Sequence, residues 1–388
     1  MKSNQSKVQA NINKISSQVT VYVVVCFLIG FAFLFVLLPK HTVSQSERRK
    51  LAQIPELTIE NIANETFMED LESYLLDHFP LRDSLRRLKS YFAYNVLVQR
   101  ENNDIYVVDG HACKVEHVLN ENSVKKTADK IVSLKETYFP NANVYYAVVP
   151  DKNTLIAPKH GYPYIDYDSM TNILQEKLNG YANIKYIDIY DTIKIEDYYT
   201  TDTHWKQECI LDTAFRIASA LGVEHMLNLS PESYNIHEIK DFYGVYSGQS
   251  ALILEPDVIK YMTNDAIDSA TVWNVEKNKY TKVYDIDKLN DENTIDKYDV
   301  FLSGATAIQV IENNIKDKSP NEMKKLIIFR DSFTSSLAPI LIEAYDEIVL
   351  IDLRYVSSAL LGDYVDFTNA DVLFLYNMQV VNNSSMLR

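Results

Sequence analysis

The chain of 388 residues is poor in cysteine, glycine, proline and tryptophan, and these shortages restrict what kind of protein it is. Its three cysteines, Cys26, Cys113 and Cys209, are too few for a disulfide framework. Cys26 lies inside an apolar run. Cys113 and Cys209 are read as free buried thiols, with a bond between them outside the cell as the open alternative. The low counts of Gly and Pro, beside abundant Asn, Lys, Ile and Tyr, indicate a compositional bias of the source genome.

The sequence is also short of positive charge, with 38 Lys and Arg against 53 Asp and Glu and a net charge of −15. Binding a phosphate backbone needs clustered Lys and Arg, so we expect no nucleic-acid partner. No phosphate loop and no ligand spacing typical of structural zinc is present, so we expect no cofactor or metal. The 27 Tyr are compatible with stacking on sugar rings, although the compositional bias is the favoured explanation.

A long uncharged run stands near the N-terminus, at residues 19–38, and reads VTVYVVVCFLIGFAFLFVLL. As a helix it would be about 30 Å long, the thickness of a bilayer core. It is longer than the apolar core of a signal peptide, so we predict a retained transmembrane anchor. Basic residues flank both of its ends and do not fix the orientation. The predicted organisation is an N-terminal tail (1–18), the anchor (19–38), a linker (39–60) and one folded domain (61–388). We place the tail in the cytoplasm largely because of the family resemblance given below.

Strand and helix patterns alternate along that domain. Apolar, β-branched runs predict strands at residues 143–150, 183–191, 325–329, 347–353 and 371–377. Helical spacing predicts helices at residues 67–79, 82–97, 124–138, 170–178, 204–222 and 334–345. Such alternation predicts an α/β fold, with a mostly parallel sheet flanked by helices on both faces. Short antiparallel strands between about 242 and 299 indicate a small β-rich insertion.

Ser332 is the best candidate nucleophile. It stands in FRDSFTSS, directly after an apolar strand and before a predicted helix. A serine hydroxyl needs a base to take its proton, and a helix N-terminus offers N–H groups where an oxyanion develops. The alternative is structural: Ser332 or Asp331 simply caps the helix.

The segment TDTHW supplies the matching base. His204, one of eight histidines, can accept a serine proton near neutral pH. Asp202 can bond the other ring nitrogen and hold the tautomer, as in a Ser-His-Asp arrangement. The alternative is that Asp202 or Thr203 caps the helix predicted from His204. Both segments fall at junctions of an α/β sheet where active sites form.

Several motifs together resemble the DHHW proteins and the SGNH-like domain of the alginate O-acetyltransferases of the AlgJ/AlgX class. These motifs are RDSF, TDTHW, DHFPLRD, SERRKLAQIPEL, VVPDK and DFYGVYS, and they extend over nearly all of the chain after the anchor. The resemblance implies a circularly permuted SGNH-hydrolase-like fold, in which the Asp-x-His block precedes the Ser block. It assigns Ser332 as the nucleophile, His204 as the base and Asp202 as its orienting acid.

The resemblance also implies an oxyanion hole. Asn377, at the end of a predicted strand, is the candidate side-chain donor, with Tyr376 beside it and Arg354 as a candidate oxyanion or substrate contact; Asn377 can equally be a plain strand terminator. The sequence departs from the pattern because Arg330 replaces the glycine of the GDS motif and no second-block glycine follows. Asp151 and Lys152, after the first strand of the sheet, are interpreted as a solvated turn.

Two kinds of function follow from these residues. The first is a membrane-anchored, extracytoplasmic O-acetyltransferase that modifies a cell-surface or secreted polysaccharide through an acyl-serine, beside a polytopic membrane-bound O-acyltransferase implied by the resemblance. A carbohydrate esterase uses the same chemistry with water as the acceptor. The second is a non-catalytic glycan-binding or assembly subunit, which the Arg330 departure and the many tyrosines favour.

Overall fold

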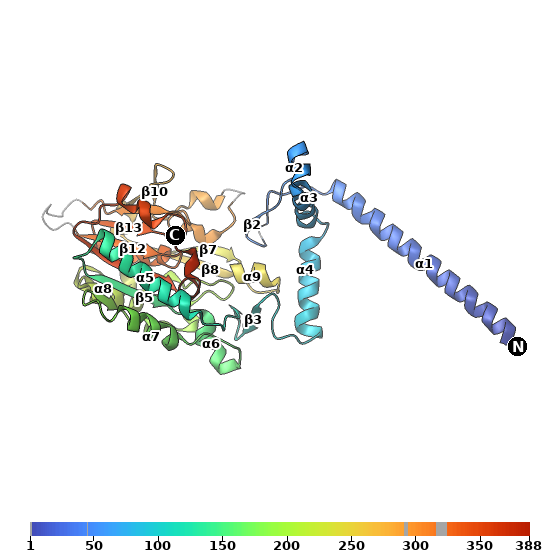
Figure 1. The fold of residues 1–388 in the computed structure, drawn as a ribbon, viewed down its shortest axis with the longest axis horizontal. Helices are drawn as coiled ribbons and strands as arrows, with labels where there is room; N and C mark the ends of the chain where they lie inside the picture. The colour runs from blue at the N-terminus through green and yellow to red at the C-terminus, as the bar shows by residue number, and fades with distance from the viewer. Residues whose placement is uncertain (1, 45, 291–293, 316–323) are drawn as a thin grey trace. The chain divides into compact units, whose positions relative to one another are not determined.

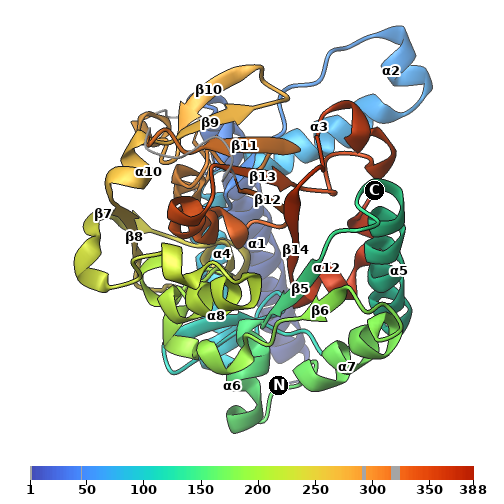
Figure 2. The ribbon, with the colours of Figure 1, turned by 90° about the vertical axis from the view of Figure 1, so that its left-hand side faces the viewer.

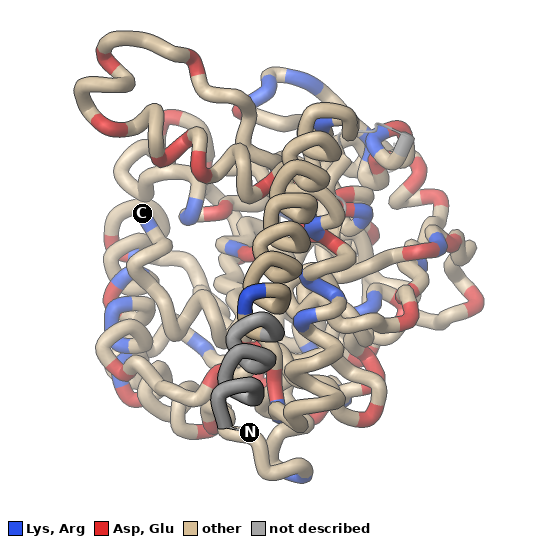
Figure 3. Tube along the Cα trace, turned by 90° about the vertical axis from the view of Figure 1, so that its right-hand side faces the viewer, with Lys and Arg blue, Asp and Glu red and all other residues tan. Residues whose placement is uncertain are grey.

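The computed structural model describes residues 2–44, 46–290, 294–315 and 324–388 (Figure 1). The chain forms two compact units, residues 1–92 and residues 93–388. The first unit begins with a long helix, α1 (Lys2–Leu37). Its part Asn13–Leu37 is long and apolar enough to cross a membrane. Beyond Lys14 this helix contains no Lys, Arg, Asp or Glu, as the colouring in Figure 3 shows.

The remainder of the first unit is a short hairpin and three helices. Its elements are β1 (Val43–Ser44), β2 (Arg49–Lys50), α2 (Ile59–Ala63), α3 (Thr66–Asp77) and α4 (Arg82–Tyr91), and a π-helical turn (Phe92–Val96) follows α4. Arg49 donates two hydrogen bonds to Asp77, and these lower the pKa of the carboxyl to about 2. Arg82 and Arg86 both pair with Glu47. These ion pairs join the SERRKL and DHFPLRD motifs.

An eight-stranded sheet forms the centre of the second unit, in the order β10-β9-β11-β13-β12-β14-β5-β6. Its parallel strands are β5 (Val144–Val149), β6 (Ile184–Tyr186), β12 (Lys325–Arg330), β13 (Glu347–Ile351) and β14 (Ala370–Asn377). Its antiparallel strands are β9 (Thr271–Asn274), β10 (Lys279–Lys282) and β11 (Ile308–Glu312). The predicted α/β fold with a mostly parallel sheet is therefore confirmed.

Alternating residues of the parallel strands bury their side chains in two cores. Ile327, Phe329 and Phe374 face one core, whereas Ile328 and Leu375 face the other. The rings of Phe329 and Phe374 stack at 4.4 Å, a contact of about 1 kcal/mol beyond its buried area. A strand buried on both faces reads as a continuous apolar run, which is why the sequence revealed these strands.

Helices cover both faces of the sheet. Figure 2 shows α5 (Glu121–Tyr138) and α7 (Tyr167–Leu178) on one side and α8 (Leu211–Leu221) on the other. The other helices of this unit are α6 (Lys152–His160), α9 (Val245–Ser250), α10 (Asp265–Ser269), α11 (Thr334–Leu337) and α12 (Met378–Asn382). Two antiparallel pairs lie outside the sheet: β3 (Ile105–Val108) with β4 (His111–Lys114), and β7 (Asn235–Phe242) with β8 (Asp257–Thr263).

Three sequence expectations need correction. The helix predicted at 204–222 begins only at Leu211, after a bridge and a short 3-10 turn (Gln207–Cys209). The strand predicted at 183–191 is only Ile184–Tyr186. The helix predicted at 334–345 is α-helical only as far as Leu337 and continues as a 3-10 helix (Ala338–Ala344). Pro339 explains this last change, because it has no N–H to continue an α-helical ladder. The cysteines are free, as expected.

Candidate active site

Two parallel strands that lie side by side deliver the candidate residues to one edge of the sheet. Arg330, the last residue of β12, pairs with Leu375 of β14. Ser332 and Asn377 therefore follow at matching positions where the two strands end. The carboxyl edge of such a sheet is where ligand sites form in α/β proteins.

Ser332, His204 and Asp202 form a continuous chain of hydrogen bonds. The Oγ of Ser332 lies 2.8 Å from Nε2 of His204, and Nδ1 of His204 lies 2.6 Å from Oδ1 of Asp202. Asp202 and His204 are buried, and Ser332 is partly exposed. When Nδ1–H donates to Asp202, Nε2 is free to accept the serine proton, which is the geometry of general-base activation.

Asp202 does not cap the helix predicted from His204, contrary to the structural alternative. Its Oδ1 also accepts a hydrogen bond of 3.1 Å from the backbone N–H of His204, and its Oδ2 accepts one of 2.8 Å from Val245. Helix α8 starts too far along the chain for Asp202 to cap it. These bonds instead hold the carboxylate in place against the imidazole.

The imidazole of His204 packs against two aromatic rings. It stacks on Tyr298 at 3.9 Å with an interplanar angle of 10°, and Phe333 lies 4.9 Å away. The neighbouring Trp205 donates from Nε1 to the carbonyl of Phe333 and to the Oγ of Ser336. The tryptophan of the TDTHW motif thus fastens the histidine segment directly to the serine segment.

The turn that carries Ser332 is held by Asp331. This buried carboxylate accepts hydrogen bonds from the backbone N–H of Phe333 (3.0 Å) and of Asn377 (2.6 Å). Burial raises the pKa of Asp331. Asp331 thus shapes the turn, whereas Ser332 bonds to His204. Helix α11 beyond it is a single α-helical turn, so its dipole contributes less to an oxyanion site than a long helix would.

Arg330, which replaces the glycine of the GDS motif, is accommodated without a left-handed backbone. Neither Arg330 nor the two residues after it has a positive φ, so the position does not need glycine. The side chain is buried and donates to Ser335 Oγ at 2.8 Å and to Gln309 Oε1 at 2.9 Å. Gln309 donates in turn to the carbonyl of Leu302. Arg330 thus supports the serine turn through these hydrogen bonds.

We expect Arg330→Gly to destabilise the protein without raising any activity. The variant leaves the buried Oε1 of Gln309 and Oγ of Ser335 without their donor, so unfolding should become about 3 kcal/mol easier. Denaturant unfolding of the detergent-solubilised chain measures this. Lys282→Gly, at an exposed position of strand β10, reports the cost of a strand glycine alone. Equal losses in the two variants would contradict the supporting role.

The three candidate contacts of the oxyanion hole have different surroundings. Asn377 ends β14 as predicted, and its Oδ1 caps α12 by accepting from Val380 N at 2.9 Å. Among the described residues, its Nδ2 has no partner. The hydroxyl of Tyr376 is buried and likewise has none. Arg354 forms a two-pronged pair with Asp352, at 2.9 and 2.7 Å.

Asp151 and Lys152 are not a solvated turn, so that interpretation was wrong. Both side chains are buried. Asp151 caps α6 through Asn153 N and accepts from Gln379 Nε2, while burial raises the pKa of its carboxyl to about 6. The error arose because the sequence cannot show that Lys152 finds backbone carbonyls as partners.

Sequence reasoning also missed the residues that enclose the Asp202 segment. Gly244 packs so closely on Asp202 and on the carbonyl of Thr201 that no Cβ fits there. Asp257 accepts hydrogen bonds from Thr200 and Thr201. The DFYGVYS motif was a usable signal for Gly244, because an isolated glycine often marks a close approach of backbones. Asp257 carried no such signal.

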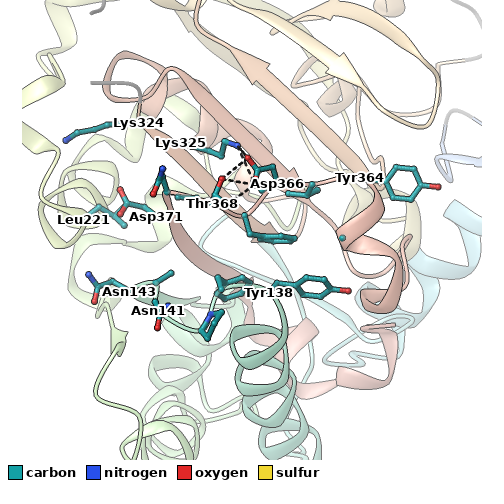
Figure 4. A pocket seen from close by; sticks show the side chains of 18 of the residues that line it. Tyr138, Asn141, Asn143, Leu221, Lys324, Lys325, Tyr364, Asp366, Thr368 and Asp371 are labelled. Carbon is teal, nitrogen blue, oxygen red and sulfur yellow. Dashed lines mark hydrogen bonds and ion pairs between the residues drawn. The ribbon is translucent and has the colours of Figure 1, made fainter. Parts of the chain in front are cut away.

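A hollow of about 1090 Å³ lies at the opposite edge of the sheet (Figure 4). Its lining includes Asn143, Lys324 and Asn369, which directly precede β5, β12 and β14. It is therefore separated from Ser332 by the length of the strands and forms no part of the candidate site.

In the described part of the chain, no group of three or more His, Cys, Asp or Glu is arranged to hold a metal ion.

Comparison with known proteins supports the fold. No family model and no curated protein matches the sequence. A crystal structure of a DHHW family protein from Eubacterium siraeum is similar, with a TM-score of 0.58 and 20% identity over 74% of this chain and 95% of that one. Bacillus cereus PatB1, solved with a sulfonyl adduct, gives a TM-score of 0.53 and 20% identity over 71% of this chain and 94% of its own. The expected likeness to DHHW proteins is thus confirmed for the fold.

Proposed function

We propose that the protein is a membrane-anchored, extracytoplasmic O-acetyltransferase that acts on a cell-surface or secreted polysaccharide. The observation that carries the proposal is the hydrogen-bonded chain from Ser332 through His204 to Asp202. A serine that is partly exposed and bonded to a buried histidine–aspartate pair is the arrangement used for acyl transfer. Helix α1 supplies the anchor in this proposal.

In the first half of the reaction, Ser332 attacks the carbonyl carbon of an acetyl donor. His204 takes the hydroxyl proton, and a bond forms between Oγ and the carbonyl carbon. The tetrahedral oxyanion needs donors, and the backbone N–H of Ser332 and Nδ2 of Asn377 are the groups we propose. Collapse of the intermediate breaks the bond to the leaving group, which receives the proton from His204.

The second half reverses these steps with a sugar hydroxyl as the attacking group. His204 takes the sugar proton, the sugar oxygen bonds to the acetyl carbon, and the bond to Ser332 breaks with return of a proton to Oγ. Water in place of the sugar gives an esterase. A polytopic membrane-bound O-acyltransferase is the proposed partner that delivers acetyl groups, and Arg354 is the proposed contact for substrate.

The non-catalytic alternative loses its main support, because Arg330 fits the fold without disturbing the serine turn.

The experiment that tests the enzyme proposal uses the full chain in detergent with p-nitrophenyl acetate, with and without an oligosaccharide acceptor. We expect hydrolysis that Ser332→Ala abolishes and Ser385→Ala, at an exposed serine, leaves unchanged. Acetyl sugar should replace part of the acetate when the acceptor is present. Equal rates for the wild type and Ser332→Ala would overturn the proposal.

A further inference from the structure

Lys152 is a buried lysine whose ammonium group is surrounded by backbone carbonyls. Only 1% of its surface is exposed. Its Nζ lies within hydrogen-bonding distance of four carbonyl oxygens, those of Ala112 (2.7 Å), Tyr199 (2.7 Å), Asp202 (2.9 Å) and Thr200 (3.2 Å), among which its three N–H groups are shared. Three of these four carbonyls belong to the segment that leads into His204.

Asp257 binds hydrogen-bond donors of the same segment. One carboxylate oxygen accepts from the N–H and the hydroxyl of Thr200, at 2.8 and 2.9 Å. The other accepts from the N–H and the hydroxyl of Thr201, both at 2.7 Å. The carbonyls of Tyr199, Thr200 and Asp202 are thus bound by a cation. The N–H groups of Thr200 and Thr201 are bound by an anion. Charge-assisted hydrogen bonds of this kind are roughly twice as strong as neutral ones.

Burying an ammonium group is costly, and an apolar side chain would fill the same space at lower cost. The contacts of Lys152 show what its ammonium group provides that an apolar side chain would not, which is hydrogen bonds to the main chain. It bonds to the main chain of Asp202 itself, two residues before His204, and it joins this main chain to strand β4 through Ala112. A shift of the Asp202 main chain would move both hydrogen bonds of the imidazole.

We propose that Lys152 is a positioning residue of the active site, which fixes the main chain of residues 199–202 so that Asp202 and His204 meet Ser332. The inference rests on the proposed function for its effect on catalysis. Its effect on the segment itself is independent of that function. A misplacement of about 1 Å in a catalytic group can cost about 10²-fold in rate.

The test compares Lys152→Met with Lys135→Met in the full chain. Lys135 is the matched control, because it is also a buried lysine and its Nζ donates to the carbonyl of Pro140, at the opposite edge of the sheet. Hydrolysis of p-nitrophenyl acetate gives kcat and KM. Hydrogen exchange measured by mass spectrometry gives the protection of the peptide that contains residues 199–205. Asp257→Asn is the second variant, should Lys152→Met accumulate poorly.

We expect Lys152→Met to lower kcat about 10²-fold with KM within about twofold, and Lys135→Met to keep kcat near the wild-type value. The peptide 199–205 should lose protection in Lys152→Met and in Asp257→Asn but not in Lys135→Met. Equal kcat values for the two lysine variants would overturn the proposal. If the wild type has no Ser332-dependent activity, the proposed function fails. In that case hydrogen exchange alone tests the role of Lys152. Unchanged protection of the peptide 199–205 in Lys152→Met would then overturn that role.

Discussion

We expect Asp202→Asn to lower kcat for acetyl-ester hydrolysis about 10⁴-fold, the size of effect seen when a triad carboxylate becomes an amide. The amide presents an N–H to Nδ1 of His204, so the imidazole takes the tautomer in which Nε2 carries the proton and cannot accept one from Ser332. KM should stay within about twofold, because Asp202 is fully buried and out of reach of a bound substrate. Steady-state kinetics of the detergent-solubilised full chain measure both constants.

Asp212→Asn is the control for this variant, because Asp212 is an exposed carboxylate on helix α8. The fold of Asp202→Asn should persist, since the remaining amide oxygen can still accept from the backbone N–H of Val245. A circular dichroism spectrum like that of the wild type checks this. If Asp202→Asn kept kcat within tenfold of the wild type in a folded protein, Asp202 would not orient His204.

The second large effect is expected from Gly244→Ala. A Cβ at this position would overlap the Cβ of Asp202 and the carbonyl oxygen of Thr201, and these are backbone-fixed atoms that cannot rotate away. The added methyl group must therefore displace the segment that carries Asp202, and with it the bond from Val245 N to the carboxylate. We expect kcat to fall at least about 10²-fold, as measured in the same assay.

Gly180→Ala is the matched control for Gly244→Ala, because a Cβ at Gly180 meets nothing within 4 Å. It should keep the wild-type kcat. The rate of phosphonylation of Ser332 by a fluorophosphonate gives a second reading of the same displacement and should fall with kcat. Wild-type rates for Gly244→Ala in both assays would show that the Asp202 segment tolerates movement.

The sheet and the pairing of Ser332 with His204 could be predicted from the sequence, for physical reasons. Strands β5 and β12 are buried on both faces, so they appear as unbroken apolar runs. Ser332 directly follows such a run, and a residue that follows a parallel strand lies at the carboxyl edge of the sheet. The resemblance then connected it with His204, and the structure brings the two side chains to 2.8 Å.

The environment of the site could not be predicted, because it depends on partners remote in the chain. Lys152 looks solvated until Ala112 and Tyr199 supply carbonyls for its charge. Arg330 looks like a lost glycine until Gln309, on another strand, accepts its hydrogen bond. The helix predicted from His204 failed for a similar reason. The hydrogen bonds that hold this segment come from tertiary neighbours, which overrule the local helical spacing.

The most direct test of the account is the mass of the full chain after reaction with an acetyl donor or a fluorophosphonate. We predict a single covalent adduct, which peptide mapping locates on Ser332. We further predict that Ser332→Ala forms no adduct and that His204→Ala forms it far more slowly. An adduct on another residue, or none on a folded wild-type chain under conditions that label a known serine esterase, would contradict the assignment of Ser332 as the nucleophile.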